Sequence, residues 1–148
     1  MLLTAVRRSP ARRSAFTLME VLIVVAIIVI LAGGAVIAIP RILEDVKKSR
    51  AHTSAVNIAK MCEAYKINSA NVDQSYPSGI NDLIQPPFGG ASYLTNGPSD
   101  LMTPWNGQFT IEPKEKSDGS VYILVWTTAP DGTPISNFGI GQAAMPKF

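Results

Sequence analysis

The stretch that decides the fold is residues 16–40, FTLMEVLIVVAIIVILAGGAVIAIP. Residues 21–39 of this stretch include no charged and no polar side chain. At about 1.5 Å per residue, residues 16–39 make a helix of roughly 36 Å, which is longer than the hydrocarbon core of about 30 Å. The length and composition therefore predict a helix that spans a membrane.

The segment before this helix is basic. Residues 1–15 contain four arginines and no acidic residue, whereas the rest of the chain has two more acidic than basic residues. A near-neutral, slightly acidic body does not favour nucleic-acid binding. Arginines before an apolar segment favour a cytoplasmic N-terminus and an external C-terminus. The arginines are Arg7, Arg8, Arg12 and Arg13.

Three interpretations of residues 1–40 are open: a cleaved secretory signal, an uncleaved anchor, and a cleaved leader followed by a retained helix. The apolar run exceeds the 7–15 residues of a secretory signal, which argues against the first. Glu20 separates the other two, because a carboxylate inside an apolar segment costs a few kcal/mol and usually has a functional partner. A cut before Phe16 would create a cationic amine, and Glu20 of one copy would pair with the Phe16 amine of its neighbour. The alternative is that Glu20 only extends to the membrane interface.

Residues 14–23, SAFTLMEVLI, resemble the N-terminal signal of type IV pilins and of the pseudopilins of type II secretion. The resemblance implies that a prepilin peptidase cleaves between Ala15 and Phe16 and methylates the new Phe16 amine. It also implies that Glu20 is the glutamate used in assembly. The family usually has Gly before the cut and this chain has Ala15, whose small side chain leads us to expect processing.

Beyond Pro40 the sequence predicts an amphipathic continuation of the helix, over residues 40–70. Its apolar positions recur at spacings of three and four. They are Ala55, Ile58, Ala59, Cys62 and Tyr65. Gly33, Gly34 and Pro40 either allow a bend during assembly or mark the membrane exit. Opposite charges predict two ion pairs along this helix, Glu44–Lys48 and Glu63–Lys66.

Two single residues of this helix have plain expected roles. Cys62 is the only cysteine, so no intrachain disulfide forms, and a buried thiol is expected. His52 is the only histidine and is expected to be solvated.

Residues 71–148 are predicted to form a small α+β head. Proline and glycine are frequent up to residue 119, which predicts loops and one short helix at residues 79–85. Alternating and β-branched residues predict an antiparallel hairpin of residues 108–112 and 121–127. A weaker strand is expected near residues 135–138. The complete expectation is a leader (1–15), a membrane-spanning half-helix (16–39), an amphipathic half-helix (40–70) and a head with about three strands.

The head resembles the major, G-type pseudopilin of type II secretion in three places. These are Tyr76-Pro77, the Thr-Pro-Trp-Asn-Gly segment at residues 103–107, and residues 127–132. That family often binds calcium in the loop after its Asp-Gly. Residues 133–148 contain no Asp or Glu, so Asp131 is only a weak candidate and no metal or other cofactor is expected. Trp105 and Trp126 are expected to pack in the core.

The expected function is therefore structural: a pseudopilin of the bacterial inner membrane, with a single span and a periplasmic or external head. Its expected partners are prepilin peptidase, copies of itself, minor pseudopilins, the inner-membrane secretion platform and lipid. The alternative is a pilin of a surface type IV pilus, working in adhesion, motility or DNA uptake. The absence of a cysteine-bounded loop favours the pseudopilin. No catalytic motif appears, so an anchored periplasmic enzyme is not favoured.

Mass spectrometry of the mature N-terminus tests the processing. The resemblance implies a chain that begins with N-methylated Phe16, because cleavage after Ala15 frees the Phe16 amine for methylation. An intact Met1 in the membrane-extracted protein would contradict the cleavage.

Overall fold

The computed structural model describes residues 16–146, and the predicted leader, residues 1–15, lies outside them. The chain divides into two compact units, residues 1–41 and 42–148. Each unit is described on its own. Helix α1 (Leu18–Lys66) contributes its first part to one unit and its second part to the other.

The first part of α1 is an apolar helix with no packing partner among the described residues. Every side chain from residue 18 to residue 34 is exposed. Within the described chain α1 is the one helix long and apolar enough to cross a membrane. The helix also continues through Gly33, Gly34 and Pro40. This confirms a long N-terminal helix, and its exposed apolar surface requires a cover of lipid or of other helices.

The second part of α1 forms one wall of the head. Four of the five predicted apolar positions are buried, whereas Ala59 is half-buried, and Ala51 extends the buried stripe by one turn. The buried stripe is Ala51, Ala55, Ile58, Cys62 and Tyr65. The helix ends at Lys66. The Asn71 side-chain amide caps this end: it donates to the Tyr65 carbonyl at 3.2 Å and links it to the Ser75 carbonyl at 2.8 Å.

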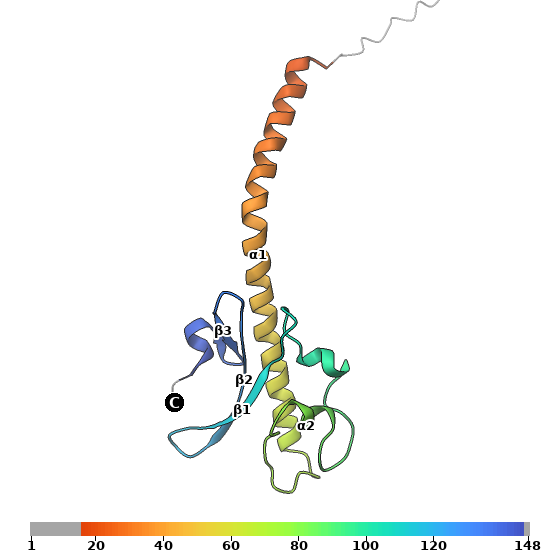
Figure 1. The fold of residues 1–148 in the computed structure, drawn as a ribbon, viewed down its shortest axis with the longest axis vertical. Coiled ribbons are helices and arrows are strands. Elements are labelled where there is room, and N and C mark those ends of the chain that lie inside the picture. Colours follow the sequence, from red (N-terminus) through yellow and green to blue (C-terminus); the bar gives the residue numbers. More distant parts are fainter. Residues whose placement is uncertain (1–15, 147–148) are drawn as a thin grey trace, which may run out of the picture. The chain divides into compact units, whose positions relative to one another are not determined.

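An antiparallel sheet in the order β1-β2-β3-β4 packs on this part of the helix (Figure 1). The strands are β1 (Thr110–Glu115), β2 (Val121–Thr128), β3 (Pro134–Ser136) and β4 (Gly139–Ile140). The fold is therefore α+β, and the predicted hairpin is confirmed. Two details differ from the prediction. The first strand starts later than residue 108 and includes Pro113, which is tolerated because β1 is an edge strand. The fourth strand is two residues long, which is too short to give a recognisable sequence pattern.

The core of the head lies between the sheet and the buried stripe of α1. Ile111, Ile123, Val125 and Ile135 supply the sheet side of the core. Leu83 closes it from the short helix α2 (Ile80–Ile84), which the sequence predicted, and Leu101 from the 3-10 helix η1 (Gly97–Leu101). The two tryptophans are only half-buried, so the prediction of core tryptophans holds in part. They are Trp105 and Trp126.

The histidine and the cysteine of α1 have different outcomes. The prediction of a solvated His52 is wrong, because His52 is half-buried and its Nδ1 lies 2.7 Å from the Ser136 carbonyl oxygen. A carbonyl only accepts, so Nδ1 carries the proton. Cys62 is fully buried as expected, and this burial raises the pKa of its thiol to about 12.

The packing of the head predicts a contrast between two truncations. Ile58 is 1% exposed at the centre of the buried stripe, whereas Val72 is 88% exposed. Ile58→Ala should lower the free energy of unfolding by about 2–5 kcal/mol, because it removes apolar contacts and leaves a cavity. Val72→Ala should change it by less than about 0.5 kcal/mol. Urea unfolding of a soluble fragment, residues 42–148, measures both, and equal effects would contradict the assigned core.

Candidate assembly site

The start of α1 is a reciprocal pair between Thr17 and Glu20. The Thr17 hydroxyl accepts a hydrogen bond from the Glu20 backbone N–H at 3.2 Å. In return, the Glu20 carboxylate accepts from the Thr17 backbone N–H at 2.9 Å and from the Thr17 hydroxyl at 3.0 Å. This is a capping box, which satisfies donors that a helix N-terminus otherwise leaves without partners.

The capping box gives Glu20 a local role that the sequence analysis did not assign. The Thr-x-x-Glu spacing at residues 17–20 is the signal that would have found it. Glu20 lies in the first turn of α1, and Phe16, which is 84% exposed, lies two residues before the helix begins. Ala15, the other residue of the predicted cleavage site, lies outside the described residues. The carboxylate is thus held beside the position where cleavage would create the new amine.

A second group of polar contacts joins α1 to the head through three residues on successive turns. Trp105 Nε1 donates to Glu44 Oε2 at 3.0 Å, and His52 reaches the Ser136 carbonyl. Between them, Lys48 donates to Asp131. The spacing of four residues places Glu44, Lys48 and His52 on one side of the helix. Each one meets a different segment of the head.

These contacts correct both predicted ion pairs. Glu44 pairs with Lys47 at 2.7 Å, while Lys48 turns to Asp131. Further along, Glu63 accepts from the Tyr76 hydroxyl at 2.6 Å. The Lys66 ammonium lies 4.3 Å from the centre of the Tyr76 ring. Glu44 keeps a partner on the helix, Lys47, whereas segments beyond α1 supply the partners of Lys48, Glu63 and Lys66.

The Thr-Pro-Trp-Asn-Gly segment folds as a tight loop that positions Trp105. Thr103 is buried, and its hydroxyl accepts from the Gly107 N–H at 2.9 Å and from the Trp105 N–H at 3.4 Å. Asn106 adopts φ 61°, in the left-handed region that Asn tolerates better than most residues. A local hydroxyl therefore closes the loop, and Trp105 is directed at Glu44.

Asp131, the weak metal candidate, uses both carboxylate oxygens within the head. One accepts from Lys48 and the other from the Thr133 N–H at 3.0 Å. The Lys48 ammonium in particular lowers the pKa of Asp131 to about 2. Among the described residues no group of three His, Cys, Asp or Glu side chains is suitably placed for a metal.

A model of the prokaryotic N-terminal methylation motif matches residues 10–36. The chain has the N-terminus of a type IV pilin-like protein. The match covers the predicted cleavage site, Glu20 and most of the apolar run, and the motif implies processing by a prepilin peptidase and assembly with pilin-like subunits. No significant match is found among curated proteins or among solved structures. The pilin-like assignment therefore depends on the N-terminal segment.

The Lys48–Asp131 contact predicts a pH dependence in the stability of the head. Because the pKa of Asp131 is lower in the folded state, its contribution is present above about pH 4 and is lost as the pH falls towards 2. Lys48→Met should lower the stability at pH 7 and make the loss between pH 4 and pH 2 smaller. Thermal unfolding of the head across this range measures the change. Identical pH profiles for the variant and the original head would contradict the role of the pair.

Proposed function

We propose that the chain is a structural subunit of a type II secretion pseudopilus. After cleavage before Phe16, the apolar helix of each copy packs with the same helix of other copies. The heads stand outside the membrane, and growth of the short filament drives folded cargo through an outer-membrane secretin. In this role the chain is not an enzyme.

The observation that carries the proposal is an acidic residue at the start of an otherwise uncharged helical segment, whose side chains are exposed from residue 18 to residue 34. Glu20 is the only charged residue between residues 16 and 39. An exposed apolar surface of this length needs a cover, and a carboxylate inside lipid needs a partner. A neighbouring copy supplies both the cover and the partner. Its helix covers the apolar surface, and its Phe16 amine neutralises the acid.

The capping box supports a two-step use of Glu20. In a single copy, the carboxylate is occupied by the Thr17 N–H and hydroxyl. A carboxylate has about four lone-pair sites, so a neighbouring amine can join without displacing Thr17. An ionic hydrogen bond to that amine is stronger than a neutral one. Assembly is therefore favoured over the isolated membrane helix, and the stagger between copies is set by the distance from residue 16 to residue 20.

Two features of the head support a pseudopilin over a surface pilin. The Tyr76 and Trp105 segments, which resemble the G-type pseudopilin, both anchor on α1, through Glu63 and Glu44. The head also has no disulfide-bounded loop, because Cys62 is the only cysteine of the chain. Helix contacts made by these loops, rather than a disulfide, hold the head to its helix.

Replacement of Glu20 tests the assembly mechanism. The Glu20→Ala variant should insert in the membrane to the same extent as the original chain, because it removes a charge from the apolar segment. It should nevertheless form no filaments and support no export of a secretin-dependent cargo. Membrane fractionation, electron microscopy of sheared filaments and a cargo assay measure the three properties.

Cells from which the gene for this chain has been deleted serve as the reference for this experiment. The deletion should abolish cargo export and leave surface pili intact. Loss of surface pili with normal export would replace the proposed pseudopilin with a surface pilin. Filaments of normal length from Glu20→Ala would contradict the pairing of Glu20 with a neighbouring amine.

A further inference from the structure

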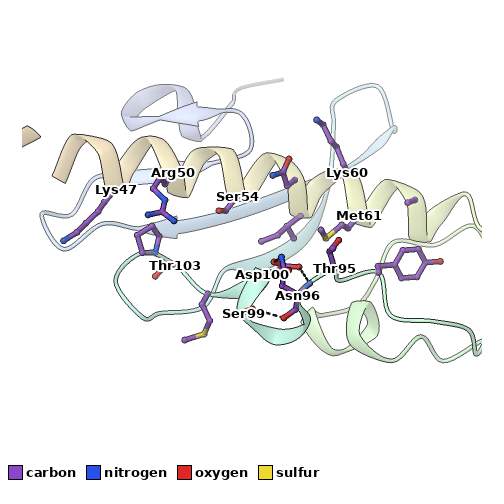
Figure 2. Close-up of a pocket in the computed structure, with 16 residues that line it drawn as sticks. Lys47, Arg50, Ser54, Lys60, Met61, Thr95, Asn96, Ser99, Asp100 and Thr103 are labelled. Carbon is purple, nitrogen blue, oxygen red and sulfur yellow. Dashed lines mark hydrogen bonds between the residues drawn. The ribbon is translucent and has the colours of Figure 1, made fainter. Parts of the chain in front are cut away.

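A groove of about 930 Å³ runs along the head between α1 and the segment that includes η1 (Figure 2). Its helix wall is formed mainly by a second stripe at spacings of three and four residues, and Ile58 of the buried stripe and Lys60 also line it. The second stripe consists of Lys47, Arg50, Ser54, Asn57, Met61 and Ala64. At about 1.5 Å per residue it extends over roughly 26 Å, enough for a short segment of another chain.

One end of the groove is positively charged. Arg50 has no ion-pair partner within the described part of the chain, and it points from α1 towards the facing wall in Figure 2. Lys47 adds a second cation, and its ammonium forms an ion pair with Glu44. The acid that lines the groove is Asp100, whose two oxygens accept from the N–H and side-chain amide of Asn96 on the same wall. The groove thus suits an acidic occupant.

The turn between β1 and β2, residues 115–120, is acidic on balance, because it carries Glu115 and Asp118 against Lys116. It is held by hydrogen bonds from the Lys116 N–H to the Ser120 carbonyl at 2.8 Å and from the Gly119 N–H to the Lys116 carbonyl at 3.0 Å. Asp118 accepts two further bonds from Ser120. Glu115 is exposed and has no ion-pair partner among the residues that the structure describes. The turn is therefore a preorganised projection with an unpaired acid.

The turn and the groove lie on opposite sides of the helix. In both Figure 1 and Figure 2 the β1–β2 turn lies on one side of α1 and η1 on the other. A projection on one side that fits a groove on the opposite side joins identical chains head to tail. A dimer formed in this way still has one free turn and one free groove, so further copies can add. The copies form a helical filament when the rotation between neighbours does not close a ring.

We propose that the 115–120 turn of one copy lies in the groove of a second copy, with Glu115 facing Arg50. This contact rests on the proposed function, because it requires copies to assemble into a filament. It adds a specific head-to-head contact to the packing of the apolar helices, and it fixes which side of each head meets its neighbour.

Disulfide trapping in filaments of the full chain tests the contact. A chain with Cys62→Ala, Ser54→Cys and Ser117→Cys places one thiol in the groove and one on the turn. Oxidation should give a ladder of covalent multimers, because a disulfide forms only when the two Cα atoms come within about 7 Å. The matched control replaces Ser54→Cys by Thr53→Cys. Thr53 is exposed and lies one residue away on a different face of α1, so this variant should give no ladder.

Charge reversal in the same background tests the proposed pair. Arg50→Glu and Glu115→Arg should each cause loss of the ladder, and the double variant should restore it. Normal filaments without a ladder would overturn the contact and leave the proposed function standing. Trapping of the groove thiol on a different acidic protein, again without a ladder, would overturn it as well. Absence of filaments from the unaltered chain would instead overturn the proposed function, and the contact with it.

Discussion

The rest of the structure depends on one constraint: an uncharged apolar helical segment of about membrane length that the described part of its own chain does not cover. Residues 18–34 are exposed throughout, and no charged residue interrupts residues 21–39. Exposure of such a surface to water is unfavourable, so lipid or neighbouring helices must cover it. Glu20 is tolerated at its start because the Thr17 amide and hydroxyl already stabilise the carboxylate. The same acid then remains able to accept a cation from outside the chain.

The second part of the helix has a different role, because the head packs on it. One stripe, centred on Ile58, is apolar and buried under the sheet. A set of polar residues one turn apart, Glu44, Lys48 and His52, reaches three separate segments of the head. Hydrophobic burial supplies most of the attachment, and the polar contacts fix how the loops sit, since exposed ionic contacts contribute little stability by themselves.

Single-sequence reasoning was most accurate where one periodicity extends over many residues. The long helix, the short helix α2 and the β1–β2 hairpin were predicted because their patterns are local. The Thr17–Glu20 capping box was also readable from spacing and was overlooked. In contrast, β4 is two residues long, and the start of β1 is set by its pairing with β2. Neither the presence of β4 nor the first residue of β1 can be predicted from the local residue pattern.

Residue pattern and chain length are enough to predict a pilin-like N-terminus, a helix long enough to span a membrane and an α+β head, because hydrophobicity and periodicity are local properties. The partners of the charged and polar groups are set by the packing of the folded head. Lys48 meets Asp131 rather than Glu44, and His52 meets β3 rather than water. These contacts join residues more than eighty positions apart, and their proximity exists only once the sheet has packed on the helix.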